Sequence, residues 1–196
     1  PIVSMMGTTS VSEDEGEARY QIKLSAAGEE DMTITLHFKG NGTASPADVD
    51  LARLMTYPGV TNVRVDPDDP TSFTFDVLVK KGDVSFDLRL PIINDDFTEI
   101  DESFTLSLTK ATGAEGQILP STDPRAAQYP TTVTTEILDD GSGPHASISV
   151  DAQAGPGENW LSTANFKVGE AGFESDAGVY YRVSLDKPAA EEMFVQ

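Results

Sequence analysis

The sequence predicts an all-β protein. It should form an antiparallel β-sandwich in residues 1–142, followed in residues 143–196 by a linker and the first strands of a second, incomplete unit of the same kind. Short runs of alternating apolar and polar residues recur along the chain, bounded by Gly, Pro and Asx residues. Only residues 47–55 permit a helix, and a short one. The opening pattern of the chain also returns near its end.

The alternating runs have the period of half-buried strands, with one face in the core and the other in solvent. Because each run is short and ends at turn residues, the runs fit a sandwich of many strands. In chain order they are residues 20–24, 32–38, 73–79, 84–90, 104–108, 133–137 and 146–150. His37 falls on the outward face of its run and His145 lies in a glycine-rich hinge, so we expect neither to have a chemical role.

An internal repeat supports the division of the chain. Val11-Ser-Glu13 returns as Val168-Gly-Glu170, and the strand Tyr20–Leu24 returns as Tyr181–Leu185. The second copy stops after its first strands, and such a copy cannot close a sandwich by itself. We expect the missing strands to come from later residues, from beyond an inserted domain, or from another chain, since unpaired edges are rarely left bare.

Charge and composition exclude several classes of function. With 13 Lys and Arg against 33 Asp and Glu, the net charge of −20 disfavours binding to nucleic acid or to an anionic membrane. The absence of cysteine excludes disulfides, thiolate nucleophiles and cysteine-held metals. No segment has the roughly 18 to 20 apolar residues of a membrane helix, and Pro1 does not begin a signal peptide. Bound cations are the expected means of offsetting repulsion among the carboxylates.

The carboxylates are concentrated at the ends of the predicted strands. Loops that are distant in sequence meet at the two ends of a sandwich, so these acids can converge. Calcium takes about six to eight oxygen ligands and needs neither histidine nor thiolate. For any single acid a solvated surface position is an equal alternative, whereas the joint pattern favours a metal. An EF-hand is excluded because proline interrupts Asp66-Pro-Asp68-Asp69-Pro, which we expect to form a polar turn.

Four motifs, taken in this order and spacing, resemble the Calx-beta domain family. The resemblance covers residues 1 to about 142, and the second copy repeats only the opening. The motifs are Val11-Ser-Glu13-Asp-Glu-Gly16, the Gly42-Thr43-Ala44 turn followed by Asp48, the acidic segment Asp95–Phe104 leading into a strand with Leu106 and Leu108, and Ile137-Leu-Asp139-Asp140.

The resemblance implies an immunoglobulin-like sandwich whose loops at one end bind calcium. Asp48-Val49-Asp50 stands where the family has an aspartate and an aromatic residue, so either acid could be the ligand there. Gly141 replaces a frequent third terminal acid, which implies fewer ions or a weaker site. The candidate metal ligands are Glu13, Asp48, Asp50, Asp95, Asp96, Glu99, Glu102, Asp139 and Asp140, with Glu170 in the second copy.

Tandem units of this family occur in large secreted bacterial adhesins of the repeats-in-toxin (RTX) type and in sodium–calcium exchangers. Strong acidity without cysteine favours the first context, so we expect a calcium-rigidified module of a secreted surface adhesin that contributes to cell adhesion or biofilm formation. Its expected partners are calcium ions, neighbouring modules of the same chain, and a surface glycan or protein. One alternative is a split scaffold for a carbohydrate- or peptide-binding domain, with Trp160 and Tyr180 available as aromatic contacts. The other alternative is a calcium-sensing regulatory domain of an exchanger-like protein.

The sequence does not predict an enzyme. It has no Gly-x-Ser-x-Gly elbow, P-loop, dinucleotide fingerprint or His-Glu-x-x-His motif. Paired carboxylates can serve glycoside hydrolysis, but the acid pairs of this chain all lie in calcium-like loop contexts.

Overall fold

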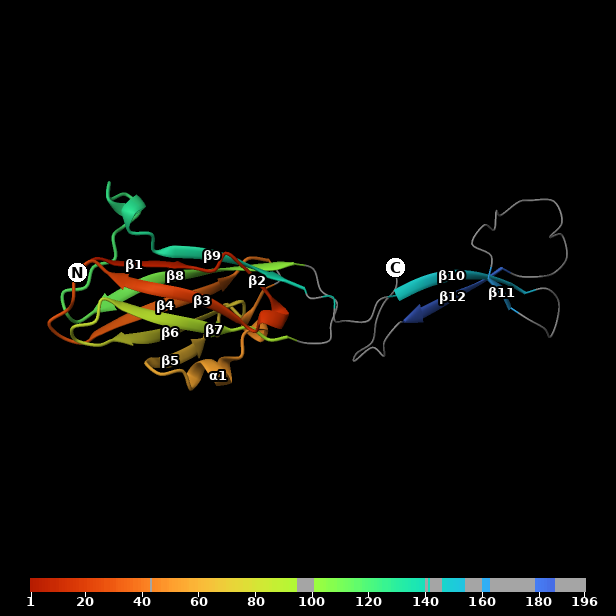
Figure 1. The fold of residues 1–196 in the computed structure, drawn as a ribbon, viewed down its shortest axis with the longest axis horizontal. Helices are drawn as coiled ribbons and strands as arrows, with labels where there is room; N and C mark the ends of the chain where they lie inside the picture. Colours follow the sequence, from red (N-terminus) through yellow and green to blue (C-terminus); the bar gives the residue numbers. More distant parts are fainter. Residues whose placement is uncertain are drawn as a thin grey trace. The chain divides into compact units, whose positions relative to one another are not determined.

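The computed structural model describes residues 1–42, 44–94, 101–139, 141, 146–153, 160–162 and 179–185. These residues fall into two compact units, unit 1 up to Asp139 and unit 2 from Gly141 onwards (Figure 1). For residues 146–153, 160–162 and 179–185, the structure describes the strands but not their side chains.

Unit 1 is a sandwich of two β-sheets (Figure 1). The smaller sheet has the order β1-β3-β7, and the larger has the order β2-β9-β8-β4-β6-β5. All neighbouring strands are antiparallel except the parallel pair of β2 and β9. This architecture confirms the predicted all-β sandwich. The strands are β1 (Val3–Gly7), β2 (Ser10–Ser12), β3 (Glu17–Leu24), β4 (Met32–Gly40), β5 (Val60–Val65), β6 (Ser72–Val79), β7 (Ser85–Pro91), β8 (Glu102–Thr112) and β9 (Thr132–Leu138).

Helical structure in the described part of unit 1 is confined to short connections. The helix α1 (Leu51–Met55) follows the 3-10 turn η2 (Pro46–Asp48), within or next to the segment that the sequence marked as permitting a helix. Two further 3-10 turns are η1 (Glu13–Glu15) and η3 (Ala126–Gln128).

The strands alternate between the core and the surface as their sequences predict. In β4, buried and half-buried residues alternate along the whole strand, and His37 lies on its outward side. Four aromatic rings form the centre of one part of the core: Phe38 stacks on Phe73 and on Phe104 with ring centroids 4.6 Å apart in both pairs, and Phe75 continues the row. All four are fully buried.

The N-terminal segment crosses from one sheet to the other. β1 pairs with β3 in the small sheet, and after Thr8 and Thr9 the chain continues as β2 beside β9 in the large sheet. A hydrogen-bond chain holds this crossing. The Thr135 hydroxyl donates to the Thr8 carbonyl at 2.6 Å, so the Tyr20 hydroxyl must be the donor to Thr135 Oγ1, also at 2.6 Å. Burial raises the pKa of the Tyr20 phenol above its ordinary range, which keeps this donor protonated.

In the hydrogen-bond chain from Tyr20 through Thr135 to Thr8, removing the middle hydroxyl should destabilise unit 1 more than removing the hydroxyl at the end. Thr135→Val leaves both the Tyr20 hydroxyl and the Thr8 carbonyl without their partner, and we expect it to lower the free energy of unfolding by about 1 to 3 kcal/mol. Tyr20→Phe keeps the ring and the bond from Thr135 to Thr8, so its expected cost is only about 0.5 to 1.5 kcal/mol. Urea denaturation of both variants measures the difference, and equal losses would contradict the assigned donor direction.

The long connection between β8 and β9 covers the outer edge of β1. Val3 donates its N–H to the Gln117 carbonyl, Gln117 donates to the Pro1 carbonyl, and Met5 donates to the Pro130 carbonyl. Leu119, within this connection, is buried. Backbone bonds on this edge of β1 are therefore supplied from within unit 1.

The turn before β6 holds the predicted polar residues. Asp66 accepts from the Asp68 N–H through its side chain and from the Asp69 N–H through its carbonyl, which is an Asx turn. Asp69 accepts from Lys39 Nζ at 2.5 Å and from the Thr71 hydroxyl at 2.7 Å. These hydrogen bonds, that from Lys39 first, lower the pKa of Asp69 to about 2.

Lys39→Met should raise the pKa of Asp69 towards its ordinary value. A lowered carboxyl pKa stabilises the folded state at pH values above the unfolded pKa near 3.8, and this stabilisation is lost as the pH falls through the folded pKa near 2. In the variant this stabilisation should therefore be smaller, and its loss should be complete at a higher pH. NMR titration of the side-chain carboxyl carbon of Asp69 measures the shift, and an unchanged midpoint would contradict the role of Lys39.

Unit 2 contains a three-stranded antiparallel sheet of order β11-β10-β12. Its strands are β10 (Ala146–Gln153), β11 (Trp160–Ser162) and β12 (Val179–Leu185). The sequence repeat matches β12 to β3. The register agrees with this match, because Leu24 and Leu185 pair with the first residues of β1 and β10, Val3 and Ala146. The second copy and its completion by further strands stay a prediction.

Candidate functional site

The ends of β2 and β9 bring two of the predicted acids next to each other. These strands are parallel and Ser12 pairs with Leu138, so the residues that follow them, Glu13 and Asp139, leave the sheet side by side. β8 starts on the other side of β9, where Glu102 pairs with Ile137. We call this end of unit 1, formed by the ends of β2 and β9 and the start of β8, the acidic tip.

The side chains at the acidic tip continue inward-facing positions of their strands. Val11, Phe104 and Ile137 are buried in the core. Because strand side chains alternate, Glu102 lies two residues before Phe104 on the same face, and Asp139 two residues after Ile137. Glu13 is only 6% exposed, which makes it the one buried charged residue in the part of the chain that the structure describes.

Asp139 carries a buried oxygen that lacks a partner. Its Oδ1 atom is inaccessible to solvent and accepts no hydrogen bond from the described residues. The Oε2 atom of the neighbouring Glu13 is buried as well. Burying a carboxylate without compensation is costly, so a carboxylate oxygen in this position is suited to a bound cation.

Asp48 and Asp50 have structural roles in capping the short helices that precede β5. Asp48 Oδ2 accepts from the Ser45 N–H at 2.6 Å, which forms a capping box at η2. Asp50 Oδ1 accepts from the Arg53 N–H at 2.9 Å and caps α1. The Asp48 carbonyl also accepts from the Ile93 N–H, which ties η2 to the chain just before residue 95.

The remaining predicted ligands, Asp95, Asp96, Glu99, Asp140 and Glu170, lie outside the described residues. Within the part that the structure describes, no three Asp, Glu or His side chains lie close enough together to hold a metal ion. The structure thus gathers Glu13, Glu102 and Asp139 at one end of the sandwich without assembling a complete site from them. None of the described helices is long and apolar enough to cross a membrane.

This architecture places unit 1 in a class: it is an immunoglobulin-like sandwich with a Calx-beta-like fold. The chain is similar to the solved structure of CBD12 from CALX1.2, with a TM-score of 0.50 and 12% identity over 93% of this chain and 71% of that chain. Also similar are the calcium binding domain CBD12 of CALX1.1 (TM-score 0.47, 15% identity, 95% and 71% covered) and the apo form of the Calx CBD1 domain (TM-score 0.44, 16% identity, 71% and 99% covered). No protein-family model and no curated protein matches the sequence.

Proposed function

We propose that unit 1 is a calcium-binding structural module whose ion is held at the acidic tip. The buried, unpartnered Oδ1 atom of Asp139 carries this proposal, because a hard cation would supply the compensation that the described residues do not. Carboxylate oxygens are the ligands that calcium prefers. Glu13 and Glu102 would complete the contribution of the described strands, since they flank Asp139 on both sides of β9.

The connection between β7 and β8 would supply the other ligands. Its described ends are both anchored near the acidic tip, because Ile92 donates to the carbonyl of Gly16, three residues after Glu13, and β8 begins at Glu102. Asp95, Asp96 and Glu99 belong to this connection, and Asp140 directly follows Asp139. The carboxylates of these loops and of the strand ends would together supply the oxygen ligands, about six, that calcium requires.

For the whole protein we propose a secreted bacterial surface adhesin of the RTX type, acting in cell adhesion or biofilm formation. In this role calcium would stiffen a string of modules, and each unit would contact its neighbours and a glycan or protein on the opposing surface. The net charge of −20 supports this setting, because bound calcium would offset the repulsion among the carboxylates. A regulatory calcium-sensing domain of an exchanger-like protein accounts for the fold equally well.

Calcium titration of the full chain by isothermal calorimetry tests the proposal. We expect saturable calcium binding that magnesium does not reproduce, because calcium accepts more ligands in a less regular geometry. Asp139→Asn should weaken this binding. Asp83→Asn makes the same change of charge at an exposed turn between β6 and β7, at the other end of the sandwich, and should leave it unchanged. Equal binding by the two variants would remove the acidic tip as the site.

A further inference from the structure

The strand β7 has an outer edge that is unpaired over Ser85–Arg89. It pairs with β3 on its other side, and a bridge between Val49 and Ile92 covers the outer edge only where β7 ends. Within the described residues no strand joins the outer edge before that bridge. The carbonyls of Asp87 and Pro91 point away from β3, since they accept from the Tyr57 hydroxyl and from the Asp50 N–H. By the alternation of an antiparallel strand, the N–H groups of Asp87 and Arg89 point the same way. Neither N–H donates a hydrogen bond within the described part of the chain.

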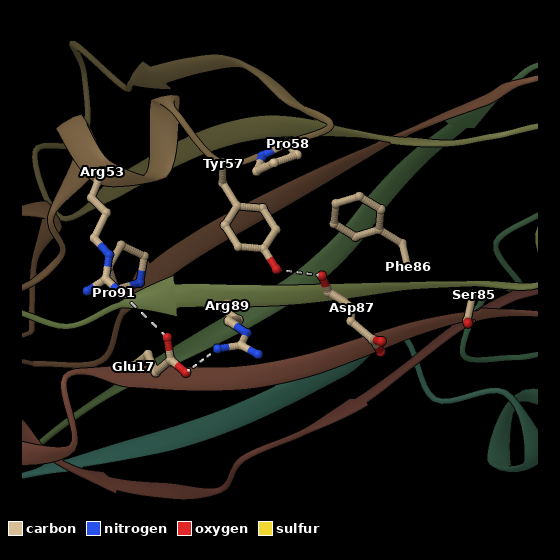
Figure 2. A pocket seen from close by; sticks show the side chains of 9 residues that line it. All are labelled: Glu17, Arg53, Tyr57, Pro58, Ser85, Phe86, Asp87, Arg89 and Pro91. Atoms are coloured by element: carbon tan, nitrogen blue, oxygen red, sulfur yellow. Dashed lines mark hydrogen bonds and ion pairs between the residues drawn. The ribbon is translucent and has the colours of Figure 1, made fainter.

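A groove runs along this open edge. It has a volume of about 580 Å³ and lies between β7 and the segment from α1 to Pro58; we call it the edge groove (Figure 2). One wall is aromatic, because the Tyr57 ring meets Phe86 edge-to-face with centroids 6.4 Å apart. Figure 2 shows the Tyr57 side chain reaching over the groove to the Asp87 carbonyl, at 3.1 Å.

The end of the edge groove at Pro91 is rich in arginine. Glu17 Oε1 pairs with Arg19 and Arg89, both at 3.0 Å, and its Oε2 atom lies 3.7 Å from Arg53. Glu17 is only 13% exposed, whereas the three arginine side chains are more than half exposed. The lining of the groove itself has two cations, Arg53 and Arg89, and two carboxylates, Glu17 and Asp87. Arg19 beside Glu17 adds a third cation, so the arginines exceed the carboxylates by one charge, on a chain whose net charge is −20. No motif marks these arginines in the sequence, because the pairing of β3 with β7 and the position of α1 bring them together.

We propose that the edge groove binds an extended acidic peptide segment of a partner protein by β-strand addition to β7. Backbone carbonyls of the peptide would accept from the free N–H groups of Asp87 and Arg89, as an added strand does on any open sheet edge. Side chains of an extended peptide alternate between two faces. On one face they would meet the apolar wall of Tyr57 and Phe86, and on the other the arginines, which selects a segment of alternating apolar and acidic residues.

Fluorescence anisotropy with the full chain tests the proposal. The probe is a short fluorescein-labelled peptide in which valine alternates with glutamate, and the control probe alternates valine with lysine. We expect saturable binding of the glutamate peptide and at least roughly tenfold weaker binding of the lysine peptide. In amide NMR spectra of the complex, the N–H groups of Asp87 and Arg89 should shift and exchange more slowly with solvent. Equal binding of the two peptides, or binding of neither, overturns the proposal.

Two pairs of variants separate main-chain pairing from charge. Asp87→Pro removes one outward N–H from an edge strand, where proline is tolerated, and Asp87→Ala removes the same side chain but keeps the N–H. We expect only the proline variant to weaken binding, and equal affinities overturn β-strand addition. Arg89→Glu should shift the preference towards the lysine peptide, whereas Arg89→Lys should keep the preference for glutamate. Thermal melts confirm that each variant is folded. Dimerisation of the chain through β7, seen by sedimentation and by protection of the same amides, would make a second copy the occupant and overturn the proposed partner.

Discussion

Phe38→Ala is expected to lower the free energy of unfolding of unit 1 by about 3 to 5 kcal/mol. The ring is fully buried and stacks on both Phe73 and Phe104, so its removal leaves a cavity between strands β4, β6 and β8. Domains of this size have a total stability of about 5 to 15 kcal/mol, so the loss would be a large fraction of the total. Chemical denaturation, monitored by far-ultraviolet circular dichroism, measures the loss.

The control for this prediction is Met55→Ala in α1. Met55 is 55% exposed, so truncating it should change the stability by less than about 0.5 kcal/mol. Phe38→Leu should lie between the two variants, since leucine refills part of the cavity. A loss for Phe38→Ala no larger than that for Met55→Ala would show that the aromatic row is not part of the core in solution.

Calcium should raise the stability of unit 1, and Asp139→Asn should abolish most of this response. At about 10 mM calcium, a site with a dissociation constant between about 1 mM and 10 μM adds about 1.4 to 4 kcal/mol. With calcium, the unaltered chain should melt at a higher temperature than the variant, and in excess chelator this order of melting temperatures should reverse. The variant should then melt at a higher temperature than the unaltered chain, because it removes the charge of a buried oxygen without a partner. Differential scanning calorimetry of both proteins in both conditions measures this crossing.

Asp83→Asn again serves as the matched control, and its melting temperature should follow that of the unaltered chain in both conditions. A melting temperature of the unaltered chain that is the same with calcium and with chelator would contradict stabilisation by the ion. If the same protein melts at the higher temperature both with calcium and with chelator, Asp139 acts in folding alone.

The sequence predicted the longer strands with a clear alternation and missed β1, β2 and β5. β3, β4, β6, β7, β8 and β9 all overlap predicted runs. β5 was not predicted, since its residues are mostly exposed on both faces and Asn62 interrupts it with a positive φ of 54°. β2 is three residues long, which is too short for any alternation to be recognised. The end of β1, at Met6 and Gly7, is exposed and lacks the pattern.

The acidic tip was predictable only in part. Local patterns placed acids at strand ends, but the adjacency of Glu13 and Asp139 depends on a parallel pairing between the two ends of unit 1, which no local pattern encodes. The capping role of Asp48 had a readable signal, because Ser45-Pro-Ala-Asp48 has the spacing of a capping box. The burial of Glu13 had no signal in the sequence, since the acids Asp14 and Glu15 that directly follow it are exposed.

The parallel pairing of β2 with β9 has a mechanical consequence for a module placed in series. Tension applied at the two termini of unit 1 pulls β2 backwards from its start and β9 forwards from its end. Because the strands run in the same direction, this force acts parallel to the strands. The hydrogen bonds over Ser10–Ser12 are then loaded in shear and must break together, not one after another. Unit 1 therefore resists stretching along the chain axis at the place where its second strand, β2, meets its last strand, β9.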